Sequence, residues 1–244
     1  MKALFTVVAA ATLLAAGETF AHGGLIDLSV FDRTEGRQLP VYWHEGRAYI
    51  AGRPGNEYQV ALRNRQREDI LAVISVDGVN VITGQTANPS QSGYVVAPRG
   101  RLDIQGWRKN LSQTAAFYFT ALPDSYAART GRPDDVGVIG VALFRRKQEP
   151  QPISPPRISS QSDAAAGARA AERDDARLGT GHGRQEYSPA THVTFERATS
   201  TPAEFITLYY DSRANLMARG IIREPSQVAP APRPFPGFVP DPRG

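Results

Sequence analysis

Residues 70–84, with the sequence ILAVISVDGVNVITG, decide the fold class. Residues 70–76 are apolar almost without interruption, which is typical of a β-strand that is covered on both faces. Asp77-Gly78 follows, and this dipeptide favours a type I′ hairpin turn because both residues tolerate a positive φ. The pattern therefore predicts a buried strand, a tight turn and a second short strand.

The segments on either side repeat this behaviour. Residues 58–62 alternate apolar and polar side chains, which indicates a strand with one solvent-exposed face. Residues 136–144 (VGVIGVALF) are again apolar on both faces. We expect further strands at 25–31, 41–43, 48–50, 93–96, 102–107 and 115–122. Short strands separated by turn residues predict an all-β protein, a single β-sandwich of antiparallel strands.

The composition changes at Gln148, where prolines, serines and then alanines become frequent. We interpret residues 148–184 as a flexible Pro/Ala-rich insertion, because such a segment buries too little apolar surface to order. Strands are expected again at 192–197 and 204–210, followed by a short helix at 212–219. Two strands alone do not make a stable sheet, so residues 22–147 and 185–222 are predicted to form one domain. Residues 223–244 are Pro-rich and are predicted to be a disordered tail, with a docking peptide as the alternative.

The N-terminus has the pattern of a secretory signal peptide at residues 1–21: one lysine, a short apolar run, and small residues before Ala21. The apolar run is shorter than the roughly 20 residues of a transmembrane helix. No later segment is long and apolar enough to span a membrane. A periplasmic or secreted location is therefore expected.

The charges are mixed rather than segregated. The chain has 28 Lys and Arg against 24 Asp and Glu, a net charge of +4, and no cysteine. Basic residues form a run only at 145–147, so no nucleic-acid partner is expected, while a mild affinity for anionic surfaces remains open. The absence of cysteine excludes thiol catalysis, iron–sulfur clusters and zinc–thiolate sites.

Several short motifs recur together: SVDGVNV, SGYVV, GWR, VGVIGVALF and LGTGHGR. In this combination the chain resembles a recurrent pattern of secreted bacterial β-rich proteins, over about residues 41–222. The resemblance implies one continuous domain that is interrupted by the insertion. It implies no activity, cofactor, ligand or catalytic residue.

The sequence contains candidates for a copper site at His22 and for an anion site at residues 179–184. Cleavage after Ala21 would make His22 the first residue, and its amine and imidazole nitrogens suit Cu(II). His44 is the first candidate for a second ligand, with His182 and His192 as the others. Residues 179–184 (GTGHGR) fit either a phosphate-binding loop or a glycine-rich hinge that re-enters the sheet; a phosphate loop requires a strand before it and a helix after it.

For ligand binding, the pair Trp107-Arg108 and the ring of Tyr94 are the candidates, because exposed aromatic rings on a sheet offer a platform for sugars or proteins. The alternative for Trp107 is a place in the core.

No G-x-S-x-G, S-x-x-K or H-E-x-x-H motif is present. The sequence therefore predicts a non-enzymatic, extracytoplasmic binding module of the bacterial cell envelope, with an envelope protein or glycan as partner and no cofactor. The alternative is a periplasmic copper-binding or redox protein that uses His22.

Overall fold

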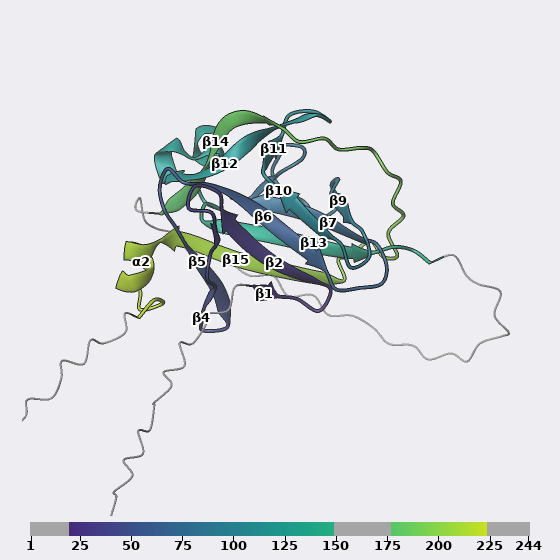
Figure 1. Ribbon diagram of the computed structural model, residues 1–244, viewed down its shortest axis with the longest axis horizontal. Helices are drawn as coiled ribbons and strands as arrows, with labels where there is room; N and C mark the ends of the chain where they lie inside the picture. Colours follow the sequence, from purple (N-terminus) through teal and green to yellow (C-terminus); the bar gives the residue numbers. More distant parts are fainter. Residues whose placement is uncertain (1–19, 149–176, 224–244) are drawn as a thin grey trace, which may run out of the picture.

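Two β-sheets pack face to face in the computed structural model, which describes residues 20–148 and 177–223 (Figure 1). The all-β sandwich predicted from the alternation of apolar and polar residues is confirmed. Most of the predicted signal peptide, most of the predicted insertion and most of the predicted Pro-rich tail lie outside the described residues, which include Phe20, Ala21 and Arg223. No helix among the described residues is long and apolar enough to cross a membrane.

The first sheet contains eight strands within the described ranges. Its central pair is β6 (Glu57–Asn64) and β12 (Gln113–Ala121), and the other strands pair with one of these two or with β2 (Ile26–Asp32). β6 pairs with β2 on one side and with β10 and β12 on the other, and β12 also pairs with β11 and β14. The strands are β1 (Ala21–His22), β2 (Ile26–Asp32), β3 (Arg37–Gln38), β6 (Glu57–Asn64), β10 (Arg101–Ile104), β11 (Gly106–Arg108), β12 (Gln113–Ala121) and β14 (Leu178–Tyr187).

The second sheet contains seven strands in the described part of the chain, in the order β4-β5-β15-β13-β7-β8, with β9 also on β7. The predicted antiparallel arrangement has one exception, because β15 lies parallel to β5. This pairing places a strand from the end of the domain between two earlier ones. The strands are β4 (Tyr42–His44), β5 (Arg47–Gly52), β7 (Ile70–Val76), β8 (Val79–Asn80), β9 (Tyr94–Val96), β13 (Val138–Arg145) and β15 (Glu204–Ser212).

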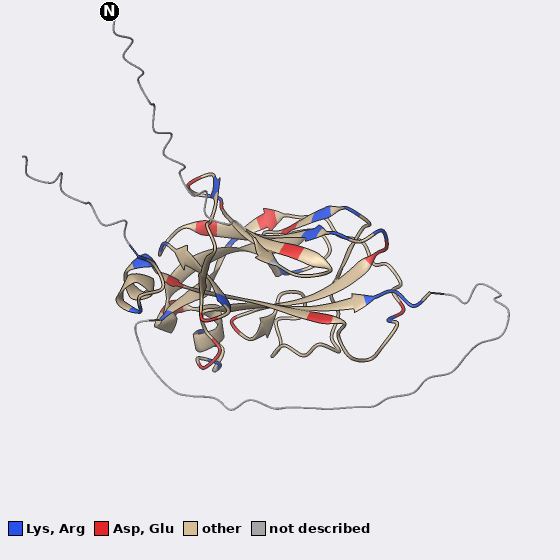
Figure 2. Ribbon diagram, turned by 90° about the horizontal axis from the view of Figure 1, so that it is seen from below, with Lys and Arg blue, Asp and Glu red and all other residues tan. Residues whose placement is uncertain are grey.

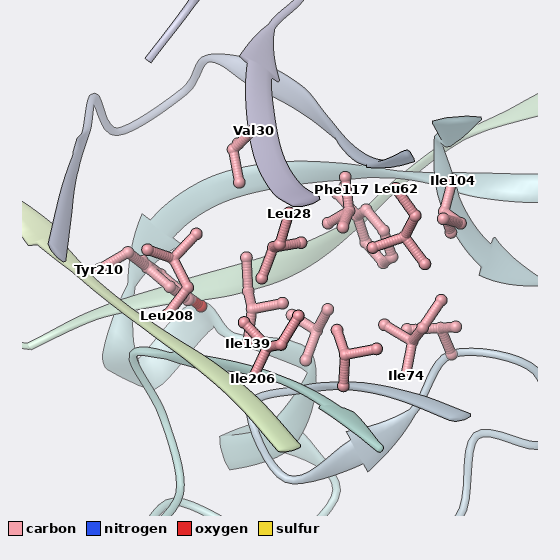
Figure 3. Close-up of a cluster of buried hydrophobic side chains, with 14 of the residues drawn as sticks. Leu28, Val30, Leu62, Ile74, Ile104, Phe117, Ile139, Ile206, Leu208 and Tyr210 are labelled. Atoms are coloured by element: carbon pink, nitrogen blue, oxygen red, sulfur yellow. The ribbon is translucent and has the colours of Figure 1, made fainter. Parts of the chain in front are cut away.

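The core lies between the sheets and is built from alternate residues of each strand. Figure 3 shows side chains of the two sheets pointing toward one another, among them Leu28, Leu62 and Phe117 from the first sheet and Ile74 and Ile139 from the second. All five side chains are at most 1% exposed. Each contributes about 1.5–3 kcal/mol through burial, which explains how a chain without disulfides is stabilised.

β7 is covered on both faces, as its sequence predicts. Ile74 points into the core, whereas Leu71 and Val73 point to the outer face of the second sheet. There they pack against Phe144 of β13 and Phe195 of the connection that precedes β15. The near-continuous apolar run is therefore explained by two separate apolar clusters.

The turn after β7 has the predicted geometry. Asp77 and Gly78 have φ angles of 51° and 70°, so both occupy the left-handed region that a type I′ turn requires.

The short helical segments are η1 (Leu122–Asp124), α1 (Tyr126–Arg129) and α2 (Arg213–Ala218). Ser125 and Ser212 cap α1 and α2, since their hydroxyls accept from backbone amides three residues on.

The glycine-rich segment 179–184 is neither a phosphate loop nor a hinge, because it lies inside β14 and pairs with β12. Its glycines allow close packing: a Cβ atom at Gly181 would lie 2.1 Å from the ring of Tyr118. The predicted insertion therefore ends earlier than residue 184. The strand expected at 192–197 is also wrong, since only Arg197 forms a bridge, with Arg146.

Candidate functional site

The connection from β14 to β15, residues 188–203, crosses from the first sheet to the second along one side of the molecule (Figure 1). Its first part is held by backbone bonds from Ser188 to Ser112 and from Ala190 to Leu111. Its later part is held at Arg197, whose guanidinium donates to the carbonyl oxygens of Pro89 at 2.8 Å and Gln91 at 2.6 Å. Residues 191–194, between these anchors, are exposed.

A groove of about 950 Å³ lies between this connection and the edges of both sheets. Residues of β9 and of β10 line it. Among the described strands, β9 pairs only with β7 and β10 only with β6. Each therefore has one side with no strand partner, and the groove is bordered by two sheet edges.

The lining of the groove mixes apolar side chains with polar and charged ones. Leu111 is 46% exposed and Val193 is 60% exposed, although both are large apolar residues that would otherwise favour burial. The larger apolar side chains are Leu71, Ile82, Tyr94, Val95, Leu102, Leu111, Val193 and Phe195.

Two of the three predicted binding residues meet in this groove. Nε of Arg108 donates to the hydroxyl of Tyr94 at 2.9 Å, and the guanidinium carbon lies 5.6 Å from the centre of the ring. The same guanidinium donates to the carbonyl oxygen of Ser188 at 2.5 Å. Arg108 thus joins β11, β9 and the connection, which positions the groove walls relative to one another.

Trp107 does not belong to this surface, because it is 3% exposed and lies in the core. Its ring meets Phe117 edge to face, and Nε1 donates to the carbonyl oxygen of Gly181 at 3.3 Å. The structure shows the core alternative for Trp107 rather than an exposed ring, because the strand is interrupted at Gln105, between β10 and β11. The interruption shifts the alternation, so Ile104 and Trp107 are both buried.

The other arginines of the groove pair with acids or carbonyl oxygens and lie against aromatic rings of the protein. Arg146 pairs with Asp69 at 2.9 Å and lies 4.6 Å from the ring of Phe195. Arg197 lies 4.0 Å from the ring of Phe144, and burial lowers its pKa. These contacts hold the connection against the outer face of the second sheet, so that the groove is a fixed feature of the fold.

A titratable cluster lies elsewhere, inside the sandwich. Burial raises the pKa of Asp77 to about 6, although hydrogen bonds from Tyr210 and from backbone amides oppose the shift. Asp77, Thr180 and Tyr58 are all fully buried. Because no solvent reaches these groups, we assign them a structural role rather than a catalytic one.

The histidines are distributed over separate elements. The backbone of His22 pairs with Asp27 of β2, and its side chain lies outside the described part of the structure. His44 lies on β4, 3.8 Å from Glu45, and His182 stacks on Tyr126. His192 lines the groove. Among the described residues, no group of three or more His, Cys, Asp or Glu is placed to hold a metal ion.

Sequence reasoning missed most of the groove. Leu111 lies in a polar turn, and Val193 and Phe195 lie in a segment that was expected to be a strand. Neither the spacing nor the residue type of these positions signals a binding surface. Comparison with protein-family models, with curated proteins and with solved structures finds no match.

Proposed function

We propose that this protein is an extracytoplasmic, non-enzymatic binding module of the bacterial cell envelope, and that its groove binds an extended segment of a partner protein. The observation that carries this proposal is the position of the groove between two sheet edges. An extended peptide can add to a sheet edge through backbone hydrogen bonds, while pockets for alternate side chains provide specificity. The apolar side chains in the groove, with Leu111 and Val193 exposed, support this mode of binding.

A peptide suits the groove better than a glycan. Sugar rings stack on open aromatic faces, and the aromatic residues of the groove are Tyr94 and Phe195. Arg108 lies over the ring of Tyr94, and Arg146 lies over the ring of Phe195. The guanidinium group of Arg146 therefore competes with a sugar for a face of Phe195, and that of Arg108 already binds the hydroxyl of Tyr94.

The test is a selection of random twelve-residue peptides on the purified protein, followed by calorimetric titration of the selected peptides. Leu111→Arg and Val193→Glu place a charge in the groove and are expected to weaken binding about ten-fold or more. Phe205→Arg is the matched control, because Phe205 is a similarly exposed apolar residue, at 64%, outside the groove.

Selected peptides that bind the control normally and the groove variants weakly would support the proposal. Failure to select any peptide, or equal binding by all variants, would overturn it. Binding of an envelope glycan that Leu111→Arg abolishes would also overturn it, because the ligand class would then be wrong.

A further inference from the structure

A second surface feature lies next to the groove, where two turns meet at one end of the sandwich. The turn after β6 and the turn before β10 form a shallow hollow of about 470 Å³. Figure 2 shows Lys and Arg on both layers at the end where β13 leads into the grey trace. The hollow is lined by Arg65, Gln66, Arg67, Glu68, Arg99 and Gln148.

Asn64 holds the two turns together. It is 2% exposed, and its Nδ2 donates to the carbonyl oxygens of Glu68 at 2.8 Å and of Ala97 at 3.0 Å. Its backbone amide donates to the carbonyl oxygen of Gly100 at 2.9 Å. The backbone that carries the arginines is thus fixed by a buried side chain, which reduces the entropic cost of binding a ligand.

The arginines of the hollow have few partners of their own. Within residues 20–148 and 177–223, the guanidinium groups of Arg67 and Arg99 have no hydrogen-bond or ion-pair partner. Among the described residues, the guanidinium group of Arg65 makes only long contacts, to the carboxylate of Asp27 and to the carbonyl oxygen of Gly23, both at 3.5 Å. Contacts within the described protein therefore do not explain why three arginines lie together in this hollow.

The neighbouring basic residues behave differently. Arg145 pairs with Glu68, and Arg146 pairs with Asp69. Because Arg145 pairs with Glu68, the charge of the acid in the hollow is already compensated, and its second oxygen accepts from Gln148. The remaining charge in the hollow is positive.

Arg99 is also unusual in its backbone. Its φ is 56°, in the region that favours glycine and asparagine. Its side chain is exposed, and in the described part of the chain its guanidinium group makes no hydrogen bond or ion pair that would stabilise the turn. A functional role for the guanidinium explains why a long basic side chain occupies a position where glycine would be less strained.

We propose that this hollow is a binding site for a phosphate group, held by Arg67 and Arg99 with Arg65 at its edge. Guanidinium groups bind phosphate oxygens through paired, charge-assisted hydrogen bonds. A phosphate fits the hollow better than a carboxylate, because its tetrahedral oxygens can accept from arginines that approach from different directions. The phosphate can belong to a soluble compound or to a lipid headgroup. The site does not depend on the peptide groove, and Leu111→Arg and Val193→Glu are expected to leave it intact.

The experiment uses two probes on the same protein. Inorganic pyrophosphate is titrated by calorimetry, and vesicles of phosphatidylcholine with and without phosphatidylglycerol are tested by flotation, both at low ionic strength. Arg67→Gln/Arg99→Gln is expected to weaken binding about ten-fold or more, since the charge-assisted bonds of both guanidinium groups are lost. Arg213→Gln/Arg223→Gln is the control. It removes the same charge from exposed arginines in and after α2, at the other end of the molecule (Figure 1).

Binding of both probes, with loss only in the Arg67/Arg99 variant, identifies the phosphate group itself as the ligand. Binding of phosphatidylglycerol vesicles alone assigns the site to a lipid headgroup, and binding of pyrophosphate alone assigns it to a soluble phosphate. The absence of binding to either probe would overturn the proposal. An equal loss in the control would also overturn it, because binding would then follow net charge. Arg99→Gly is expected to lose affinity while its Tm stays at or above that of the wild type, which separates binding from folding.

Discussion

The hydroxyl of Tyr210 donates a hydrogen bond of 2.5 Å to Oδ1 of Asp77, deep between the two sheets. Thr180 lies 2.6 Å from Tyr210, and Tyr58 lies 2.6 Å from Thr180. Because Tyr58 and Thr180 belong to the first sheet and Tyr210 to the second, the chain of hydroxyls links the sheets. A fully satisfied buried network of this kind specifies how two layers are arranged.

Tyr210→Phe is expected to lower the free energy of unfolding by about 1–3 kcal/mol, because it leaves buried partners without a hydrogen bond. Urea denaturation followed by circular dichroism measures the change. Tyr209→Phe is the matched control: Tyr209 is the preceding residue on β15 but packs outward against Tyr49, and its substitution should change stability by less than about 0.5 kcal/mol. Equal effects of the two substitutions would contradict a special role for the buried network.

The stability of the protein should depend on pH through Asp77. The folded protein raises the pKa of this carboxyl from 3.8 to about 6, so it holds the proton more tightly than the unfolded chain does. The contribution of Asp77 to the free energy of unfolding is therefore full below pH ~4 and falls as pH rises to ~6, by about 3 kcal/mol.

Asp77→Asn isolates this effect from that of other carboxyl groups. Asparagine tolerates the positive φ of this position and does not titrate. The stability of the wild type minus that of Asp77→Asn should decrease between pH ~4 and ~6 in urea denaturation. A difference that stays constant or increases over this range would show that the carboxyl is not shifted upward by burial.

The two tryptophans should respond differently to a quencher. Trp43 is 48% exposed and Trp107 is 3% exposed. Iodide is therefore expected to quench the emission of Trp43 and to leave that of Trp107 nearly unchanged. In Trp43→Phe, the remaining emission should be blue-shifted and resistant to iodide. Efficient quenching in this variant would contradict the buried position of Trp107.

Arg197→Lys is expected to release the connection between β14 and β15. Lysine keeps the charge but lacks the planar array of donors that reaches the carbonyl oxygens of Pro89 and Gln91. We expect a loss of about 1–3 kcal/mol and faster hydrogen exchange in residues 188–198, measured by mass spectrometry. Arg37→Lys, at an exposed ion pair with Glu35, is the control. It should leave the free energy of unfolding and the hydrogen exchange of residues 188–198 unchanged.

Local rules in the chain were enough to predict the class of fold. Alternation and both-face apolar runs located β6, β7 and β13, because burial of a strand face requires apolar residues at every second position. Asp77-Gly78 predicted the turn after β7, because few residues accept a positive φ. Glycines such as Gly181 misled the prediction, since their role is to admit a neighbouring ring rather than to make a loop.

The candidate site depends on contacts between distant segments. Tyr94 and Arg108 were predicted, but their position in a groove requires Ser188 and the connection to β15. The hydroxyls around Asp77 likewise come from β6, β14 and β15. Local sequence carries the conformational preference of each strand, whereas pairing, burial and charge compensation are set by which remote segments meet in the folded chain. The parallel pairing of β5 with β15, the groove and the arginine-lined hollow are therefore decided only by the assembly of the two sheets.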